Sequence, residues 1–437
     1  MKISNILLLT ILNLSLALCA SASSIREDVD DEKYLDLGNN EGDYVFDPAK
    51  QTTPDFAGVG YIKNIITGQS GSGILIAPQW VLTAASVIQN TVVEGETEED
   101  EDTVEEPRAE NIRIFFGKGG VNGDFIKLAA VDAVYVHPAW TAALLAAEDD
   151  QELLTQGVDI ALLKLSEPID DIRNYPIDTR ADSTELGALF ISGYGYFGNG
   201  KDGVIENDKF KRSVQNTVDR ILNIQVTVPG YENLVGGQLA ADFDPSFDLT
   251  INEGLRDNTL NGVPDAPEGD ELDMRYLGDG NSNEIPTNLE GTPLMGDTGG
   301  PWIVRFPNSR GFLVAGVTSF SNSDKGLYGD ISVATRVANF ADWIVPKLLE
   351  DTIPNSFSAG NGWLYREGFG FYNPDTLPWI YQAQRGYLYV VPGQNIDDPN
   401  GIWMWSRDLR AWLWTRGDVL PFAWRGDLAF TVIEWES

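Results

Sequence analysis

Residues 71–86 read GSGILIAPQWVLTAAS, two apolar runs separated by a Pro-Gln pair. The runs Gly73–Ala77 and Trp80–Thr83 have the length and the side chains that β-strands favour. Similar runs recur between about residues 52 and 345, and glycine, asparagine and aspartate residues separate them. Regular short strands with turn signals between them predict an all-β barrel or sandwich. Three more of these runs are Ile112–Phe116, Ala129–Val136 and Ile160–Leu165.

The composition fits a turn-rich β protein of more than one domain. The chain has 437 residues, of which 43% are hydrophobic, with 44 glycines and 22 prolines. This length predicts two or three domains with packed cores. One helix-like segment, Asn339–Leu349, ends the strand-rich region. A net charge of −36 argues against nucleic acid and anionic membrane surfaces as partners.

The first residues are typical of a secretory signal peptide. Lys2 precedes an apolar run, Ile6–Leu18, and the triplet Ala20-Ser21-Ala22 supplies small residues for cleavage. Cleavage after Ala22 would make Ser23 the first residue of a secreted, periplasmic or cell-surface protein, although lipidation at Cys19 is an alternative. The run is too short to span a bilayer, and no later segment predicts a membrane helix. Since Cys19 is the only cysteine, the mature chain is expected to lack disulfides.

Composition also divides the rest of the chain. Residues 23–51 are polar and acidic and are expected to form a poorly ordered lead-in. Two stretches, residues 94–110 with ten acidic residues and residues from about 230 to 290, are expected to be surface insertions. Residues 351–361 are expected to form a linker to a small module over residues 362–437.

Aromatic residues dominate that module. Eight of the twelve tryptophans follow residue 354, and aromatic residues recur in pairs two positions apart, which places both members of a pair on one face of a strand. We expect a meander of hairpins built on a degenerate repeat, which loosely resembles the aromatic repeats and wall-binding modules of some secreted bacterial proteins. The aromatic side chains would form either the module's core or an exposed row that stacks on sugar rings or peptides. The pairs are Trp363/Tyr365, Trp379/Tyr381, Tyr387/Tyr389, Trp403/Trp405 and Trp412/Trp414.

Three long motifs resemble those of the trypsin/chymotrypsin-like serine proteases. Residues 71–86 resemble the motif that ends in Thr-Ala-Ala-His, residues 158–165 (VDIALLKL) the motif of the catalytic aspartate, and residues 296–301 (GDTGGP) the nucleophile motif Gly-Asp-Ser-Gly-Gly-Pro. The resemblance covers residues 55–347 and implies two packed antiparallel β-barrels with the active cleft between them, in a domain over residues 52–350. Shorter landmarks follow the same order: Val136-His137-Pro138, Gly193-Tyr194-Gly195, Val317–Phe320 and Ala334–Val337.

Two of the three catalytic positions depart from the family pattern. The resemblance places Ser86 at the histidine position and Thr298 at the serine position, and only Asp159 matches. A hydroxyl nucleophile needs a neighbouring base, and a serine hydroxyl cannot replace imidazole near neutral pH. Loss of the serine or histidine from such a protease costs roughly a millionfold in rate. We therefore expect a catalytically inactive member of the family.

No other residue offers an obvious base. His137 is the only histidine of the chain, and its His-Pro context matches a surface turn of the family, away from the active site. Direct activation of Thr298 by Asp159 is the remaining alternative, since threonine acts as a nucleophile elsewhere with the chain's own amine as base. That alternative would make the chain a weak or atypical endopeptidase.

The resemblance also implies an oxyanion hole and a substrate cleft. The backbone N–H groups of Gly296 and Thr298 would bind a carbonyl oxygen. The base of the specificity pocket falls at Thr292, which gives no preference for basic side chains, and the cleft would also include Ser319, Phe320 and Ser321.

The family's aspartate before the nucleophile corresponds to Asp297, which by resemblance receives the α-amino group that zymogen cleavage releases. The chain has no Ile-Val-Gly-Gly-type start near residue 55, and the nearest fragment, Gly58-Val59-Gly60, lacks a preceding basic residue. We therefore expect Asp297 to be paired differently or its loop to be loose.

Calcium binding is an open alternative to a cofactor-free chain. Asp279, Asn281, Asn283 and Glu290 have calcium-loop spacing, but Glu284 replaces the glycine at the turn position and Pro286 interrupts the loop.

Together these features predict a secreted pseudoprotease that binds an extracellular protein or an envelope polymer. The alternatives are a weak endopeptidase that uses Thr298 and a glycan-anchored surface protein of the cell envelope.

Overall fold

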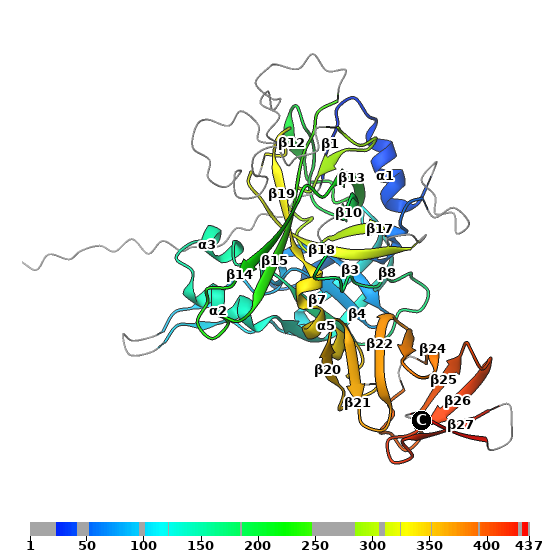
Figure 1. Cartoon of the computed structure of the whole chain (residues 1–437). Coiled ribbons are helices and arrows are strands. Elements are labelled where there is room, and N and C mark those ends of the chain that lie inside the picture. The colour runs from blue at the N-terminus through cyan, green and yellow to red at the C-terminus, as the bar shows by residue number, and fades with distance from the viewer. Residues whose placement is uncertain are drawn as a thin grey trace, which may run out of the picture.

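The computed structural model of the chain describes residues 23–41, 52–95, 101–120, 122–183, 186–246, 285–305, 311–323, 325–350, 352–391, 394–426 and 431–435. Strands dominate these ranges and the helices are few and short, so the predicted all-β class is confirmed. Figure 1 shows a large body and a smaller sheet, coloured orange to red, that extends from it. No helix in the ranges above is long and apolar enough to cross a membrane.

Six antiparallel strands close into a barrel in the N-terminal half of the body. The two apolar runs of residues 71–86 lie in β3 and β4, which pair with each other. Nearly all residues of both strands are buried, as expected where a strand packs on both faces. In the order in which they pair around the barrel, the strands are β2 (Val59–Asn64), β3 (Ser70–Ala77), β4 (Trp80–Thr83), β9 (Ala161–Leu165), β8 (Asp124–Val136) and β7 (Ile112–Gly119).

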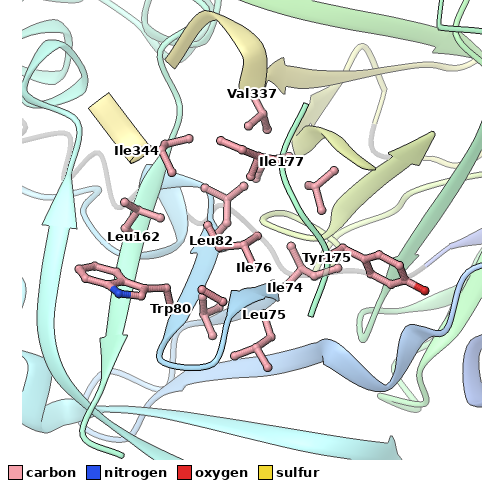
Figure 2. Close-up of a cluster of buried hydrophobic side chains, with 14 of the residues drawn as sticks. Ile74, Leu75, Ile76, Trp80, Leu82, Leu162, Tyr175, Ile177, Val337 and Ile344 are labelled. Carbon is pink, nitrogen blue, oxygen red and sulfur yellow. The ribbon is translucent and has the colours of Figure 1, made fainter. Parts of the chain in front are cut away.

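A seven-stranded antiparallel sheet forms the C-terminal half of the body, where the second barrel is predicted. Figure 2 shows that the two halves share one core, because Ile74 and Leu82 of the barrel lie in the same cluster as Val337 and Ile344. The strands, in pairing order, are β13 (Arg212–Thr217), β10 (Ala188–Gly193), β17 (Pro301–Arg305), β18 (Phe312–Ser321), β19 (Ile331–Arg336), β15 (Val235–Asp242) and β14 (Arg220–Gln225).

Strand β15 lies within the stretch from about residue 230 to 290 that was expected to be a surface insertion. For this strand the expectation is wrong, since Gly236–Asp242 is buried between β14 and β19. Its glycines mark close packing, not a loop. A Cβ atom at Gly236 would lie 2.4 Å from the carbonyl oxygen of Gln156, and one at Gly237 would lie 2.7 Å from the side chain of Asn339. Residues 247–284 lie outside the described ranges.

The acidic lead-in is folded where the structure describes it, which corrects the expectation of poor order. β1 (Ser24–Ile25) pairs with β11 (Phe197–Asn199) on one side and β16 (Gly291–Thr292) on the other, and β12 (Gly203–Glu206) completes this small sheet. Helix α1 (Asp31–Asn39) follows and buries Tyr34 and Leu37. The polar composition does not reveal these few anchors, because most other residues of the helix are polar and are only half-buried or exposed.

The remaining helices are short and connect strands. The described residues of the acidic stretch 94–110 are mostly exposed, as expected of a surface insertion, and contribute β6 (Thr103–Val104), which pairs with β5 (Val92–Val93) just before the stretch. The expected helix near residues 339–349 is present as η5 and α5. The helices are η2 (Phe56–Gly58), η3 (Ala85–Val87), η4 (Ala109–Asn111), α2 (Pro138–Ala146), α3 (Asp150–Leu154), η5 (Val337–Phe340) and α5 (Ala341–Leu348).

The C-terminal module is a nine-stranded antiparallel meander in which each strand pairs with the next. Its first strand, β20, lies within the stretch expected to be a linker. The aromatic pairs lie in β21, β23, β24, β25 and β26, one pair in each strand. In chain order the strands are β20 (Phe357–Gly360), β21 (Trp363–Arg366), β22 (Gly370–Thr376), β23 (Trp379–Gln382), β24 (Gly386–Val390), β25 (Ile402–Ser406), β26 (Ala411–Thr415), β27 (Phe422–Arg425) and β28 (Thr431–Glu434).

The two faces of this sheet differ in composition. The aliphatic residues between the aromatic pairs, such as Leu388, Met404 and Leu413, are fully buried, whereas both members of each pair are exposed or half-buried. Trp435, which follows the last strand, packs against Phe369 near the first strands, so the sheet curls around its aliphatic face. Of the two alternatives, a core built from the aromatic pairs is therefore wrong.

Candidate active site

Strand pairing brings Ser86 and Asp159 together. Ser86 lies in η3, directly after β4, and Asp159 lies just before β9. Because β4 and β9 are antiparallel with Thr83 opposite Ala161, the end of one strand lies beside the start of the other. The structure thus places these two predicted site residues side by side, and both are buried.

The Asp159 carboxylate is held by serine donors. The Ser86 N–H donates to Oδ1 at 2.8 Å, and the Ser86 hydroxyl donates to Oδ2 at 2.9 Å. The Ser319 hydroxyl also donates to Oδ2, at 2.6 Å. Burial raises the pKa of Asp159, while the hydrogen bonds from Ser319 and Ser86 oppose that rise. Ser86 thus donates to the carboxylate that would orient a histidine. Its own hydroxyl group cannot act as a base in place of the imidazole.

Thr298 lies in a tight loop that packs on the first barrel. The Ser72 N–H donates to the Thr298 carbonyl oxygen at 2.8 Å. Gly299 has a φ of +85°, and a Cβ atom there would lie 2.2 Å from the Ser72 carbonyl oxygen, so only glycine fits. Thr298 is half-buried, and its hydroxyl forms no hydrogen bond with any described residue. The loop is therefore fixed, but no base contacts the expected nucleophile.

The expected oxyanion donors lie in the same loop. Gly296 has a φ of +94°, and its carbonyl oxygen accepts a hydrogen bond of 2.7 Å from the Ser72 hydroxyl. Within the described ranges, the N–H groups of Gly296 and Thr298 donate to no other group. The loop therefore keeps two donors that could bind a carbonyl oxygen.

The residues assigned to the specificity cleft are mostly engaged elsewhere. Thr292 is fully buried in β16, and its backbone pairs with that of Ser24 in β1. Ser319 is bound to Asp159, and the Ser321 hydroxyl donates to the Ile331 carbonyl oxygen at 2.9 Å. Phe320 is half-buried at the end of β18. The N-terminal segment therefore covers the expected base of the pocket. The sequence signal for this contact is the short run Ser23-Ser24-Ile25, at the start of the acidic lead-in.

Asp297 has an unexpected neighbour. Its carboxylate is fully buried, and Oδ2 accepts hydrogen bonds from the Leu294 N–H at 3.1 Å and from the Ser23 hydroxyl at 3.2 Å. Burial raises the pKa of Asp297 to about 7. The different pairing expected for Asp297 is thus a hydrogen bond with Ser23, which lies 36 residues before Val59, the first residue of β2.

His137 caps helix α2 and packs against η5 and α5. Its Nδ1 accepts a hydrogen bond of 3.3 Å from the Ala139 N–H at the start of α2, where Pro138 occupies the first turn. The ring packs edge-on against Phe340 and Trp343, with centroid distances of 5.0 Å. The contacts support the structural role that the sequence suggests for this residue.

Acid is expected to destabilise the fold through His137. Burial lowers the pKa of His137 from 6.5 to about 4, so the folded chain binds fewer protons than the unfolded chain between these values. The stabilisation is therefore complete above pH 6.5 and is lost as pH falls through 4, by about 3 kcal/mol. His137→Asn keeps an N-cap acceptor without the titration. Urea unfolding at pH 7 and pH 4 measures the free energy of unfolding of both chains. Between these pH values the native chain should lose about 3 kcal/mol more of it than the variant. If the difference in the free energy of unfolding between the two chains is the same at both pH values, the titration of His137 does not cause the loss.

The calcium alternative stays a prediction. Asp279, Asn281 and Asn283 lie outside the described residues. Glu290 is buried, and its Oε2 accepts hydrogen bonds from the N–H and hydroxyl of Thr287. Burial raises the pKa of Glu290 to about 8. Among the residues that the structure describes, no three His, Cys, Asp or Glu side chains are grouped to hold a metal ion.

Comparison with known proteins agrees with this geometry. The family model described as Trypsin matches residues 51–235 and 275–344, which together are more than half of the chain. A comparison with curated proteins gives no match. The matched residues include Ser86 and Asp159 with the adjoining strands β4 and β9, as well as the Thr298 loop. The chain therefore belongs to the trypsin family of serine proteases.

Proposed function

We propose that this chain is a secreted pseudoprotease that binds a polysaccharide of the cell envelope through the aromatic face of its C-terminal sheet. The observation that carries the loss of catalysis is the hydrogen bonding of Asp159. Its two oxygens accept from Ser86 and Ser319, and no described base contacts the Thr298 hydroxyl. Within the ranges that the structure describes, no group is placed to act as a general base on Thr298.

The aromatic face supports a binding role. Rings of neighbouring strands contact one another, as in Tyr381–Tyr387 at 5.1 Å and Trp405–Trp412 at 5.5 Å between centroids. Trp414 and Trp424 stack at 4.7 Å. Exposed aromatic side chains gathered on one face in this way mark an interaction site. The exposed members are Phe357, Phe371, Tyr381, Tyr387, Trp403, Trp412, Phe422 and Trp424.

The surroundings of these rings favour a sugar polymer. An open depression of about 700 Å³ is lined by Trp403, Trp405 and Trp412, together with the polar side chains of Gln394 and Arg410. Flat rings stack on the apolar faces of sugars, and the polar groups suit their hydroxyls. Each inner strand already pairs with a neighbour on both sides, so a peptide cannot add to this face as a strand. The net charge of −36 disfavours a nucleic acid.

Removing rings from this face should weaken retention on polysaccharide. The test is co-sedimentation of the exported chain with isolated peptidoglycan sacculi and with an insoluble neutral glucan. Trp403→Ala and Trp412→Ala are each expected to reduce affinity by about threefold to tenfold, because a stacked ring contributes about 0.5–1.5 kcal/mol. Ile126→Ala, an exposed side chain on β8 of the barrel, serves as the matched control and should bind like the native chain. If a variant with both Trp403→Ala and Trp412→Ala is retained as well as the native chain, the aromatic face does not bind these polysaccharides.

A further inference from the structure

Arg410 differs from the other arginines of the C-terminal module in its contacts. Six arginines and no lysine follow residue 354. Arg410 is exposed, and its guanidinium forms no hydrogen bond or ion pair with any residue that the structure describes. This positive charge is therefore available to a ligand. The guanidinium groups that contact another described group are those of Arg366, Arg385, Arg407, Arg416 and Arg425.

The backbone gives no structural reason for an arginine at position 410. The residue lies in the turn between β25 and β26 with a φ of +48°, in the left-handed region that glycine adopts most readily. Other side chains hold the turn. The Leu409 N–H donates to the Ser406 hydroxyl at 3.2 Å, and the Arg425 guanidinium donates to the Leu409 carbonyl oxygen at 3.3 Å. The side chain of Arg410 takes part in neither contact.

Arg410 lines the open depression between Trp403 and Trp412, and this depression offers hydrogen-bond donors but no free side-chain acceptor. Among the residues that line it in the described ranges, none is acidic. The one side-chain oxygen among them is Oε1 of Gln394, which accepts a hydrogen bond of 2.6 Å from the Trp403 N–H. The Gln394 amide nitrogen and the Arg410 guanidinium remain as donors. A negatively charged group that only accepts hydrogen bonds complements this set.

We propose that the depression binds a carboxylated sugar unit of an acidic polysaccharide, with the carboxylate paired to Arg410. The inference rests on the proposed function, because the sugar ring would stack on Trp403 or Trp412. An ionised carboxylate only accepts hydrogen bonds, and its two oxygens match the forked donors of a guanidinium. A uronic acid carries its carboxylate on the sugar ring itself. One unit can therefore stack on an indole and reach Arg410 within the same depression.

The acidity of the whole chain does not oppose this pairing. With six arginines and nine acidic residues, residues 355–437 carry little of the net charge of −36. Charges that lie more than about 8 Å away are largely screened at physiological ionic strength. Asp408, which shares the turn with Arg410, does not line the depression. It lies against Gly386 instead, where a Cβ atom would be 2.2 Å from its Oδ2.

The test compares two polymers with the same backbone, polygalacturonate and its methyl ester, by calorimetric titration of the exported chain. The native chain should bind polygalacturonate at least about tenfold more tightly, because esterification removes the charge-assisted hydrogen bonds. Arg410→Gln should lower the affinity for polygalacturonate to that for the ester and leave the affinity for the ester unchanged. Arg407→Gln changes the neighbouring exposed arginine, which does not line the depression. This matched control should keep the preference.

Trp412→Ala separates this inference from the proposed function, since loss of the ring should weaken binding of both polymers. If the native chain binds both polymers equally and Trp412→Ala weakens both, the sugar site stands and the carboxylate pairing is overturned. A preference that survives Arg410→Gln also overturns the pairing. Tighter binding of a teichoic acid, whose charges are phosphates, would assign a phosphate to Arg410 instead of a carboxylate. Failure of the native chain to bind either galacturonan would overturn both proposals.

A stability measurement distinguishes a ligand contact from a role in the turn. Arg410→Gly removes the charge and suits the left-handed backbone, so this variant should lose the preference for polygalacturonate and melt no lower than the native chain. A melting temperature several degrees below that of the native chain would show that the arginine supports the turn, which contradicts the proposal.

Discussion

Replacing Ser86 by histidine and Thr298 by serine in one chain is expected to create proteolytic activity that the native chain lacks. The strand pairing that places Ser86 beside Asp159 would place an imidazole at the same carboxylate. The Thr298 loop is fixed on β3, and the N–H groups of Gly296 and Thr298 have no partner in the described structure. The gain should recover a large part of the roughly millionfold that these side chains contribute in a protease of this type.

The single variants are the controls for this gain. Thr298→Ser alone lacks a base, and Ser86→His alone keeps the hindered threonine hydroxyl, so each should stay close to the uncatalysed rate. Hydrolysis of an unfolded, fluorescently labelled protein measures all three chains. An inert but folded double variant would contradict the view that only two side chains separate this site from a working one.

Asp159→Ala is expected to have the largest effect on stability. The substitution leaves the Ser86 N–H, the Ser86 hydroxyl and the Ser319 hydroxyl without their acceptor in a buried site. Unsatisfied buried donors and a small cavity together should lower the free energy of unfolding by about 3–5 kcal/mol, as measured by urea unfolding.

Two milder variants test the cause of that loss. Ser319→Ala removes one donor and keeps the carboxylate, so it should cost about 1–2 kcal/mol. Asp159→Asn keeps an acceptor oxygen without the buried charge and should fall between the other two. A loss below about 1 kcal/mol for Asp159→Ala would show that the carboxylate does not hold this part of the fold together.

Sequence motifs predict the body of the protein well, because each motif lies in or beside a strand. The family fold determines which strands are neighbours. The pairing of Thr83 with Ala161 explains why residues so far apart in sequence as Ser86 and Asp159 meet. The contact between Ser319 and Asp159 could not be predicted in this way, since a serine in a polar stretch has many alternatives. Its only signal is its place in the Val317–Phe320 landmark.

Composition misleads in three places, each for a physical reason. In β15 the glycines allow close packing against Gln156 and Asn339, although they resemble loop residues. At the N-terminus a few buried side chains fix a segment that is acidic on average. In the C-terminal module the period-two pattern identifies the strands but not the buried face, because both faces are hydrophobic and the curvature of the sheet decides between them.

The central claim is that the native chain carries out no proteolysis. The most direct test compares the exported native chain with its Thr298→Ala variant on an unfolded protein substrate, with mass spectrometry to detect new chain ends. We predict that both chains cleave no faster than buffer, because no base in the described part of the chain hydrogen-bonds with Thr298. Cleavage by the native chain that Thr298→Ala abolishes would contradict this account and would show that the site has a base other than histidine.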